Sequence, residues 1–372
     1  HALQHRGQES AGIATSDGDR IRLFAEMGLV TQIFDERALA GLPGTHAIGH
    51  TRYSTSGSSH LQNAQPFLVK GPHGPIAVAH NGNIVNAELL REGLEAEGVT
   101  FEASSDTEVI ARLLVNASGE TWEQRFAQLM RRATGAFSLT VLAPEGVFAA
   151  RDPMGVRPLC IGELDGGYVF ASETCALDHL GARFVREVEP GEVVRADEDG
   201  LTSWFPAGRR DLDVVSPQRL CLLEFIYFAR PDSHMGGELL HPARMRMGAA
   251  LAREHSVEAD LVIGVPDSAT AAAIGYSQES GIQYAEGLIK NRYVGRTFIM
   301  PNQGERTRSV RHKLNVIEEE FAGKDVLLVD DSIVRGTTSR QIVDMARASG
   351  ARKVLFASTS PPLVHPCVYG ID

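Results

Sequence analysis

The stretch that decides the fold of the second half of this chain reads Lys324-Asp-Val-Leu-Leu-Val-Asp-Asp-Ser-Ile-Val-Arg-Gly-Thr-Thr338. Residues 326–329 predict a buried strand, and Asp330 and Asp331 follow it directly. Apolar residues recur at helical spacing after Thr338, which predicts a helix over residues 338–349. Such a strand end places both carboxylates at the carboxyl edge of a sheet, where open α/β folds bind their ligands.

The loop between this strand and helix carries groups that suit a phosphorylated sugar. Backbone N–H groups from Arg335 to Thr338 can point at a phosphate beside a helix start. The hydroxyls of Ser332, Thr337 and Thr338 add donors. Two carboxylates suit sugar hydroxyls and a divalent cation. The order of acids, loop, Gly, Thr and Thr resembles the ribose-5-phosphate loop of the phosphoribosyltransferases. The alternative is an ordinary strand, turn and helix with acids at the turn.

The two halves of the chain have different patterns. Strands and helices alternate in the second half, which predicts a parallel α/β sheet. The first half mixes short strands, helices and Gly-rich turns, which favours α+β layers. We expect the boundary in the polar, proline-bounded residues 206–218, giving domains of residues 1–212 and 213–372. The expected elements are strands 76–80, 137–142, 167–171, 260–265, 326–329 and 353–357, and helices 87–97, 105–115, 268–280 and 338–349.

Composition excludes several classes of protein. The chain has 372 residues and a net charge of −11, so broad binding to nucleic acid or to an anionic membrane is not expected. No apolar run approaches the roughly 20 residues of a membrane span. The four cysteines form no Cys-x-x-Cys pair, which favours a reduced, cytoplasmic setting. No signal peptide is visible, but the chain starts at His1, and both ends are expected to be cut.

Three segments of the first half carry the groups that a free amino acid needs. Arg52 follows a predicted strand, Asp106 begins a predicted helix, and Asn81 and Gly82 are expected on a tight turn after residue 80. Arginine pairs with an α-carboxylate, an acid takes an ammonium, and an amide with a glycine N–H can hold an oxyanion. Taken singly, the three are a surface cation, a helix cap and a hairpin turn.

Together these segments resemble the class II, N-terminal-cysteine, glutamine amidotransferases. The order is also that of the family: Leu3-Gln-His-Arg-Gly-Gln-Glu9, Gly49-His-Thr-Arg52, His80-Asn-Gly-Asn83, Ser105-Asp-Thr-Glu108, Arg151-Asp-Pro-Met-Gly-Val-Arg-Pro-Leu159 and Ala171-Ser-Glu-Thr-Cys175. With the second half, the whole chain is similar to the amidophosphoribosyltransferase family. The resemblance implies an N-terminal-nucleophile, α+β layered domain followed by an α/β phosphoribosyltransferase domain.

The family's reaction would convert phosphoribosyl pyrophosphate, glutamine and water to 5-phosphoribosylamine, glutamate and pyrophosphate, the first committed step of purine synthesis. By resemblance, Arg52 would hold the glutamine carboxylate, Asp106 its ammonium, and Asn81 with Gly82 the oxyanion. The family's nucleophile is a cysteine shortly before Leu3, and it is absent from this chain. Residues 1–372 alone are therefore expected to lack glutaminase activity.

The resemblance also assigns the phosphoribosyl pyrophosphate site. Asp267 and Ser268 would form the pyrophosphate loop, which is compatible with a helix N-cap there, and a flexible loop would start at Lys290. Ser268, Asp330 and Asp331 would hold Mg²⁺. The expected substrate-binding residues are Asp267, Ser268, Lys290, Arg292, Tyr293, Asp330, Asp331, Ser332, Arg335, Gly336, Thr337 and Thr338.

Regulation and a second cofactor are implied as well. Purine nucleotides would inhibit near Lys290, Arg292 and Ser332. The basic run Arg306, Arg308, Arg311 and Lys313 is either a solvated helix face or a phosphate contact.

Cys221 and Cys367 match two of the four ligands of a [4Fe–4S] cluster in one branch of the family; the alternative is two small buried apolar residues. Cys160 and Cys175 are expected in the core, and a homotetramer is implied.

Two other functions remain open at this level. One is a sensor that binds phosphoribosyl pyrophosphate without catalysis. The other is a phosphoribosyltransferase that acts on a nucleobase, which leaves the first half of the chain unexplained.

Overall fold

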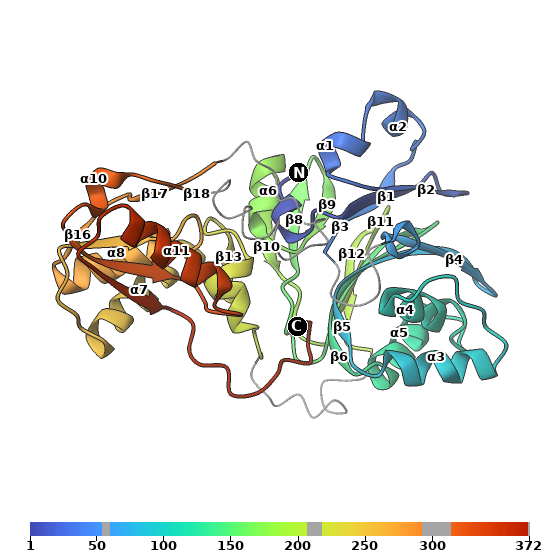
Figure 1. The fold of residues 1–372 in the computed structure, drawn as a ribbon. Coiled ribbons are helices and arrows are strands. Elements are labelled where there is room, and N and C mark those ends of the chain that lie inside the picture. Colours follow the sequence, from blue (N-terminus) through green and yellow to red (C-terminus); the bar gives the residue numbers. More distant parts are fainter. Residues whose placement is uncertain (54–59, 207–217, 292–313, 371–372) are drawn as a thin grey trace. The chain divides into compact units, whose positions relative to one another are not determined.

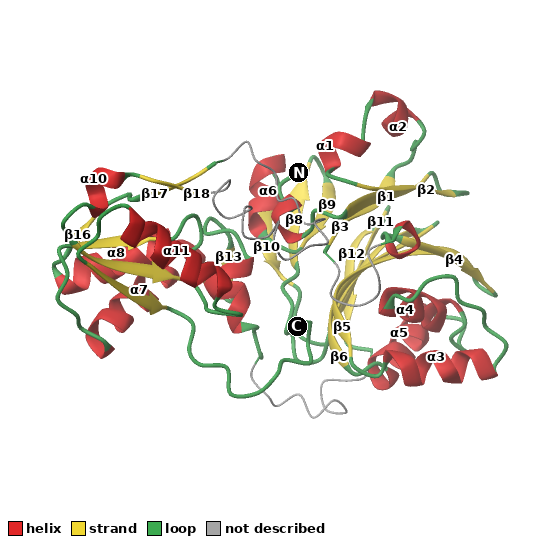
Figure 2. Ribbon diagram, in the orientation of Figure 1, coloured by secondary structure: helices red, strands yellow, loops and turns green. Residues whose placement is uncertain are grey.

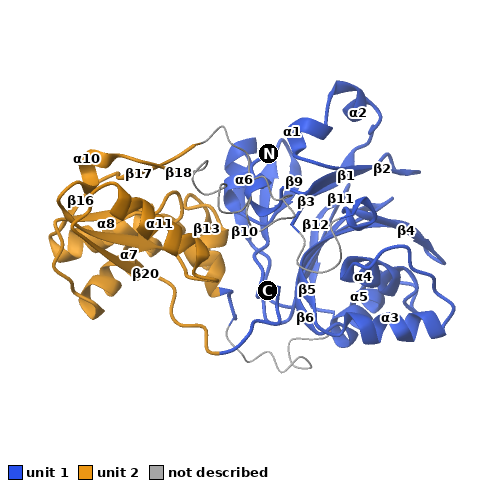
Figure 3. Ribbon diagram, viewed as in Figure 1, with its two compact units in different colours: residues 1–221, 365–372 blue, residues 222–364 orange. Residues whose placement is uncertain are grey.

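The computed structural model describes residues 1–53, 60–206, 218–291 and 314–370. The chain divides into two compact units, one of His1–Cys221 with His365–Asp372 and one of Leu222–Val364 (Figure 3). The boundary expected after residue 212 lies outside the described residues. Residues 365–370 group with the first unit, although the sequence assigned them to the second domain, because side chains of the first unit bind their backbone.

The first unit contains three antiparallel sheets and a group of helices (Figures 1 and 2). The sheets have the strand orders β2-β1-β3, β12-β11-β7-β6-β5-β4 and β10-β8-β9. Its elements are η1 Gln4–Arg6, β1 Ser10–Ser16, β2 Ile21–Met27, α1 Val30–Ile33, α2 Glu36–Ala40, β3 His46–Arg52, η2 Leu61–Asn63, β4 Phe67–Gly71, β5 Gly74–Ile84, α3 Ala87–Ala96, α4 Asp106–Val115, α5 Trp122–Arg132, β6 Gly135–Ala143, β7 Gly146–Arg151, β8 Cys160–Leu164, β9 Gly167–Ala171, α6 Thr174–Leu180, β10 Arg183–Glu187, β11 Val193–Asp197 and β12 Gly200–Trp204.

Successive side chains of β5 point to opposite faces of the strand, and this alternation explains the layers of the unit. Val78 faces the core under α3, α4 and α5, whereas Ala77 and Ala79 face the smaller core beneath β1 and β3. Small side chains on that second face let two sheets approach, and large ones on the first face fill the space under the helices. The predicted α+β layering of the first half is confirmed.

The second unit is built on a parallel sheet of order β16-β15-β19-β20. The core on one face of the sheet includes residues of α7 and α8, and the core on the other includes residues of α11, so the predicted parallel α/β sheet is confirmed. Its elements are η3 Glu224–Phe228, β13 His234–Met235, β14 Glu238–Leu239, α7 Leu240–Glu254, β15 Leu261–Gly264, α8 Thr270–Ser280, β16 Gln283–Tyr284, β17 Leu288–Lys290, β18 Leu314–Val316, α10 Glu318–Phe321, β19 Asp325–Asp330, α11 Thr337–Ala348 and β20 Lys353–Ser358.

Helices α7 and α8 pack closely because glycines face the partner helix. A Cβ on Gly248 would lie 1.8 Å from the carbonyl oxygen of Ala272, and one on Gly275 would lie 1.9 Å from that of Met245. Any side chain at either position would therefore push the helices apart. Within the described ranges, no helix is both long and apolar enough to cross a membrane.

Candidate active sites

Arg52 and Asp106 are buried together in the first unit. Arg52 ends strand β3, is 3% exposed, and lies 3.8 Å through Nη1 from Glu9 Oε2, so it is not the surface cation considered above. Burial lowers the pKa of Arg52, and the negative charges of Glu9 and Asp106 oppose that shift. A guanidinium that interacts with two carboxylates is held in a position from which it can bind an anionic ligand.

Asp106 is the first residue of α4 and does not cap it. Ser105 is the N-cap, because its hydroxyl accepts from Thr107 N over 3.2 Å. Asp106 Oδ2 accepts instead from Ile84 N of strand β5, over 3.0 Å, and lies 3.7 Å from His80 Nδ1. Burial alone would raise the pKa of Asp106, but His80 and the backbone N–H groups of Ile84 and Thr107 lower it. The carboxylate is thus held ionised.

Asn81 and Gly82 lie inside a strand, so the predicted tight turn was wrong. β5 continues to Ile84, and these two residues pair with Ser138 and Phe137 of β6. The 11-residue strand overrides the local turn preference of Asn-Gly because β6 pairs with β5 as far as Ile84. Asn81 Nδ2 is buried and has no hydrogen-bond partner among the described residues.

Gly82 is required by sterics. Its φ is +155°, and a Cβ there would lie 1.9 Å from the Ala136 carbonyl oxygen and 2.8 Å from His80 Nε2. The strand can therefore approach both groups only at a glycine. An amide donor without a partner beside such a backbone is the arrangement that an oxyanion needs.

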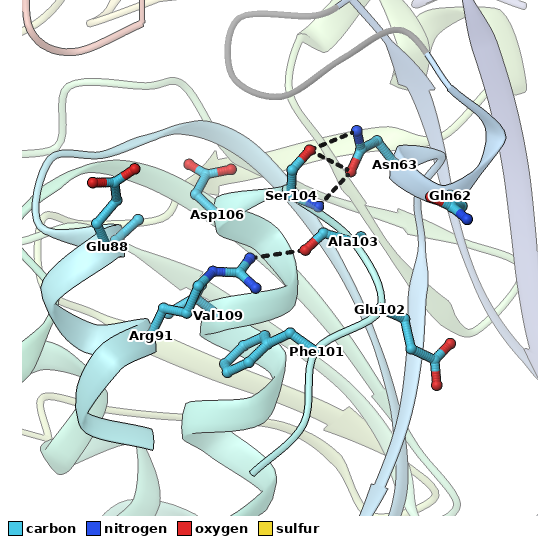
Figure 4. Close-up of a pocket in the computed structure, with 11 residues that line it drawn as sticks. Gln62, Asn63, Glu88, Arg91, Phe101, Glu102, Ala103, Ser104, Asp106 and Val109 are labelled. Atoms are coloured by element: carbon cyan, nitrogen blue, oxygen red, sulfur yellow. Dashed lines mark hydrogen bonds between the residues drawn. The ribbon is translucent and has the colours of Figure 1, made fainter. Parts of the chain in front are cut away.

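A cavity of about 610 Å³ opens next to Asp106, between α3 and the residues that precede α4 (Figure 4). Arg91 crosses it, donating to Ala103 O over 2.9 Å with its guanidinium 4.2 Å from the Phe101 ring centre. On the other side Ser104 and Asn63 are hydrogen-bonded to each other. The cavity therefore presents charged groups of both signs, Arg91 and Asp106, together with the aromatic ring of Phe101.

In the second unit, Asp330 and Asp331 lie where the sequence predicted, at the end of β19. Both are buried, at 7% and 8% exposure. Burial first, and then the charge of Asp331, raise the pKa of Asp330 to about 7. The pair therefore holds more negative charge than its surroundings stabilise.

Loops after two neighbouring strands meet at this pair. β15 and β19 are parallel, with Gly264 opposite Val329, so both chains leave the sheet at the same edge. Ser268 donates its hydroxyl to Asp331 Oδ2, and Ser332 donates to Asp331 Oδ1 over 2.5 Å. The N-cap of α8 is Ala269 with no side-chain bond, so the expected cap at position 267 or 268 was wrong.

Some of the remaining residues expected around the phosphoribosyl site are described by the structure, and the others lie outside the described residues. Lys290 pairs with Asp267, and Gly336, with φ +70°, is the N-cap of α11 with Thr337 and Thr338 in its first turn. Ile333 and Val334, between Ser332 and Arg335, are exposed. Arg292, Tyr293 and the basic run Arg306, Arg308, Arg311 and Lys313 lie outside the described residues.

Comparison with known proteins identifies the family. A glutamine amidotransferase domain matches residues 50–179. Amidophosphoribosyltransferase of Synechococcus elongatus is 51% identical over all of this chain and 76% of its own length, and that of Bacillus subtilis is 47% identical over all of this chain and 77% of its own length. The chain belongs to the amidophosphoribosyltransferase family.

Solved structures of the family agree with this assignment. One, described as the allosteric regulatory enzyme of purine biosynthesis, has a TM-score of 0.91 at 46% identity and covers all of this chain and 79% of that one. Another, glutamine phosphoribosylpyrophosphate amidotransferase from B. subtilis with ADP and GMP, has a TM-score of 0.90 at 46% identity and covers all of this chain and 80% of that one. The predicted family and glutamine-dependent function in purine synthesis are confirmed, and the chain is an enzyme.

The four cysteines of the chain fall into two groups by their exposure. Cys160 and Cys175 are buried, as predicted, and burial raises the pKa of Cys160 to about 12. Cys221 is half-buried and Cys367 is exposed, so neither is the buried apolar residue considered above. Among the described residues, no three or more His, Cys, Asp or Glu side chains form a metal-binding group.

Two polar residues of the first unit with long-range contacts were not predicted individually. His80 approaches Asp106, and its backbone N–H donates to Gln65 Oε1 over 2.7 Å. Glu173, fully buried at the N-cap of α6, binds His5 Nε2 and Arg6 Nε, both over 2.6 Å. Both residues stand in the quoted motifs, but their contacts join segments up to 168 residues apart, which local sequence cannot indicate.

Proposed function

We propose that the first unit hydrolyses glutamine with the residues that the sequence singled out. Arg52 binds the α-carboxylate, Asp106 binds the α-ammonium, and Asn81 Nδ2 with the Gly82 N–H stabilises the oxyanion. The observation that carries this proposal is the buried Asn81 amide, which has no hydrogen-bond partner among the described residues. A buried donor without a partner costs about 1–3 kcal/mol, which binding of an oxyanion would recover. The nucleophile is not among residues 1–372, so these are supporting roles.

We propose that the second unit binds phosphoribosyl pyrophosphate at the edge of its parallel sheet. Asp330 and Asp331 bind the ribose hydroxyls. The phosphate binds at the start of α11, where first-turn N–H groups lack helical partners and the helix dipole favours an anion. Asp267 and Ser268 bind the pyrophosphate. Proposed contacts further along the chain are Lys290, Arg292, Tyr293, Ser332, Arg335, Gly336, Thr337 and Thr338.

The acid pair has the chemistry of a magnesium site. Carboxylates and a hydroxyl are hard oxygen donors, and burial together with the adjacent charge of Asp331 raises the pKa of Asp330, which a bound cation would counteract. Ser268, Asp330 and Asp331 would hold Mg²⁺, which would shield the charge of the leaving pyrophosphate. Mg²⁺ usually takes only one or two carboxylates and completes its shell with water and substrate oxygens. The absence of a three-residue metal group among the described residues is therefore compatible with this proposal.

We also propose that Cys221 and Cys367 are two ligands of a [4Fe–4S] cluster. Both lie on segments that bind one loop of the first unit: Cys221 N donates to Val156 O over 3.3 Å, and Arg157 Nη2 donates to Tyr369 O over 3.2 Å. Four thiolates are needed. Cys160 and Cys175 are buried and are not among the proposed ligands.

We also propose the regulation, assembly and location that the resemblance to the family implies. A relative binds ADP and GMP, which supports purine-nucleotide inhibition near Lys290, Arg292 and Ser332. We further propose a homotetramer. Four thiols without disulfides support a reducing, cytoplasmic compartment.

The test is pyrophosphate release from phosphoribosyl pyrophosphate and Mg²⁺ by the intact enzyme, with ammonium or with glutamine. Release with both nitrogen sources is expected. Binding without release would favour the sensor, and release driven by adenine or hypoxanthine would favour the nucleobase transferase.

A further inference from the structure

Residues 365–370, here called the return segment, are held on the first unit by hydrogen bonds. Asn83 Nδ2 donates to Val368 O over 2.9 Å. Arg157 Nη2 donates to the carbonyl oxygens of Tyr369 and Gly370 over 3.2 and 3.3 Å. Val368 is 51% exposed, so burial contributes little there and these bonds fix the backbone.

Gly370 shows how closely the return segment fits. Its φ is +113°, and a Cβ at this position would lie 2.7 Å from Arg157 Nη2 and 3.5 Å from Asn83 Cβ. A side chain at position 370 would therefore displace the guanidinium that holds the segment. Substitution of this glycine would disturb the contact without changing any residue of strand β5.

Both residues that hold the return segment are also connected to the pair Asn81 and Gly82. Asn83 follows Gly82 on β5. On the neighbouring strand β6, Ser138 pairs with Asn81 and donates its Oγ to Arg157 O over 3.1 Å. These contacts form a closed ring. Strand β5 holds the return segment, the return segment is bound by Arg157, Arg157 is bound by β6, and β6 pairs with β5.

The loop that carries Arg157 is itself rigid. Arg151 is 1% exposed and donates to Arg157 O over 2.7 Å and to Gly155 O over 3.0 Å. Asp152 accepts from Phe137 N over 3.2 Å, at the residue that pairs with Gly82. The ring therefore joins fixed groups, and the return segment is its most exposed member.

We propose that the return segment acts as a brace for strand β5, which carries Asn81 and Gly82. Asn83 and Arg157 are then positioning residues for glutamine hydrolysis. The proposal rests on the oxyanion role of Asn81 and Gly82 given above. An oxyanion hole works only when its donors are fixed in advance, so loosening β5 at Asn83 lowers the rate of the chemical step. Binding of glutamine through Arg52 and Asp106 does not need the brace.

The test compares Asn83→Ala, Gly370→Ala and their double variant in the intact enzyme. Asn116→Ala is the matched control, because Asn116 makes a similar amide-to-carbonyl bond to Arg112 O over 2.8 Å at the far end of α4. The measurements are kcat and KM for glutamine, the ammonia-dependent rate, and hydrogen exchange of residues 365–370.

Each single variant is expected to speed exchange in the return segment and to lower kcat for glutamine about three- to tenfold. KM for glutamine and the ammonia-dependent rate stay within about twofold, since neither depends on the oxyanion donors. The double variant is expected to be no worse than the poorer single variant, because both break one brace. The control is expected to change none of these quantities.

Three results would overturn the brace. They are faster exchange with unchanged kcat, unchanged exchange in both variants, and effects that multiply in the double variant. Failure of the underlying assignment looks different, because Asn81→Ala would then leave glutamine hydrolysis intact. An impaired Asn81→Ala enzyme with unimpaired Asn83→Ala and Gly370→Ala enzymes rejects the brace alone.

Discussion

Two buried aspartates, one in each unit, have opposite pKa shifts. Burial acts to raise the pKa of both. For Asp106, His80 and the N–H groups of Ile84 and Thr107 more than offset burial, and the pKa falls. For Asp330, the neighbouring charge of Asp331 adds to burial, and the pKa rises to about 7.

The difference separates two ways of building a site. Around Asp106 the protein supplies the positive and polar partners itself, as expected where the ligand is a small zwitterion that needs fixed partners. Around Asp330 the protein leaves negative charge uncompensated, as expected where the substrate brings its own cation. Substitutions in the two units should therefore fail in different assays.

The largest effect is expected for Asp331→Asn. Loss of this charge weakens the proposed ribose and Mg²⁺ contacts, and several kcal/mol of lost stabilisation corresponds to roughly 10³-fold in rate. Pyrophosphate release should fall by this factor with glutamine and with ammonium alike. A fall with glutamine only would show that Asp331 acts in glutamine hydrolysis instead of in pyrophosphate release. The contrast between the two units would then be lost.

Asn81→Ala is expected to impair the proposed glutamine site of the first unit selectively. Removing one oxyanion donor costs about 10²–10³-fold in kcat, so glutamine-dependent synthesis should fall by that factor while the ammonia-dependent rate is kept. Steady-state rates with the two nitrogen sources measure this, and Asn116→Ala serves as the control for a lost amide. Equal loss in both assays would indicate misfolding instead.

Asp106→Asn sharpens the comparison at the level of binding. A hydrogen bond to a charged group contributes about 1.5–3 kcal/mol, so KM for glutamine should rise roughly 10- to 100-fold with a smaller change in kcat. A large fall in kcat at unchanged KM would assign Asp106 to the chemical step.

The same substitution predicts a pH dependence of stability. The folded pKa of Asp106 lies below that of the unfolded chain, so its stabilisation is fully present above the unfolded pKa and is lost as pH falls through the folded value. The difference in unfolding free energy between the native enzyme and Asp106→Asn should be constant from about pH 7 to 5 and shrink below about pH 4. Urea unfolding across this range measures it, and a difference that shrinks above pH 5 would contradict the lowered pKa.

Ser268→Ala should give the smallest effect. Among the described residues its hydroxyl makes one hydrogen bond, to the buried carboxylate of Asp331. Asp331 also accepts from Ser332, so loss of the Ser268 bond should cost about 1.5 kcal/mol, the low end for a bond to a charged group. KM for phosphoribosyl pyrophosphate should rise about tenfold with both nitrogen sources. An effect as large as that of Asp331→Asn would make the Ser268 hydroxyl as important to the proposed Mg²⁺ site as that carboxylate.

The sequence by itself determined the order and kind of most elements. The helix predicted at 338–349 is Thr337–Ala348, and the strand predicted at 167–171 is Gly167–Ala171. It also placed Asp330 and Asp331 at a strand end and Asp106 in the first turn of a helix. These features follow from hydrophobic period and local backbone preference, which act over a few neighbouring residues.

Only the tertiary structure decided that Asn81 and Gly82 lie mid-strand, that His80 supports Asp106, and that residues 365–370 return to the first unit. Asn83 and Val368 are 285 positions apart. Contacts at such separations depend on sheet register and packing of the whole unit, and the Asn-Gly pair favours a turn unless a neighbouring strand, here β6, pairs with it. Local preference therefore predicted where the polar groups occur, and long-range pairing decided which of them meet.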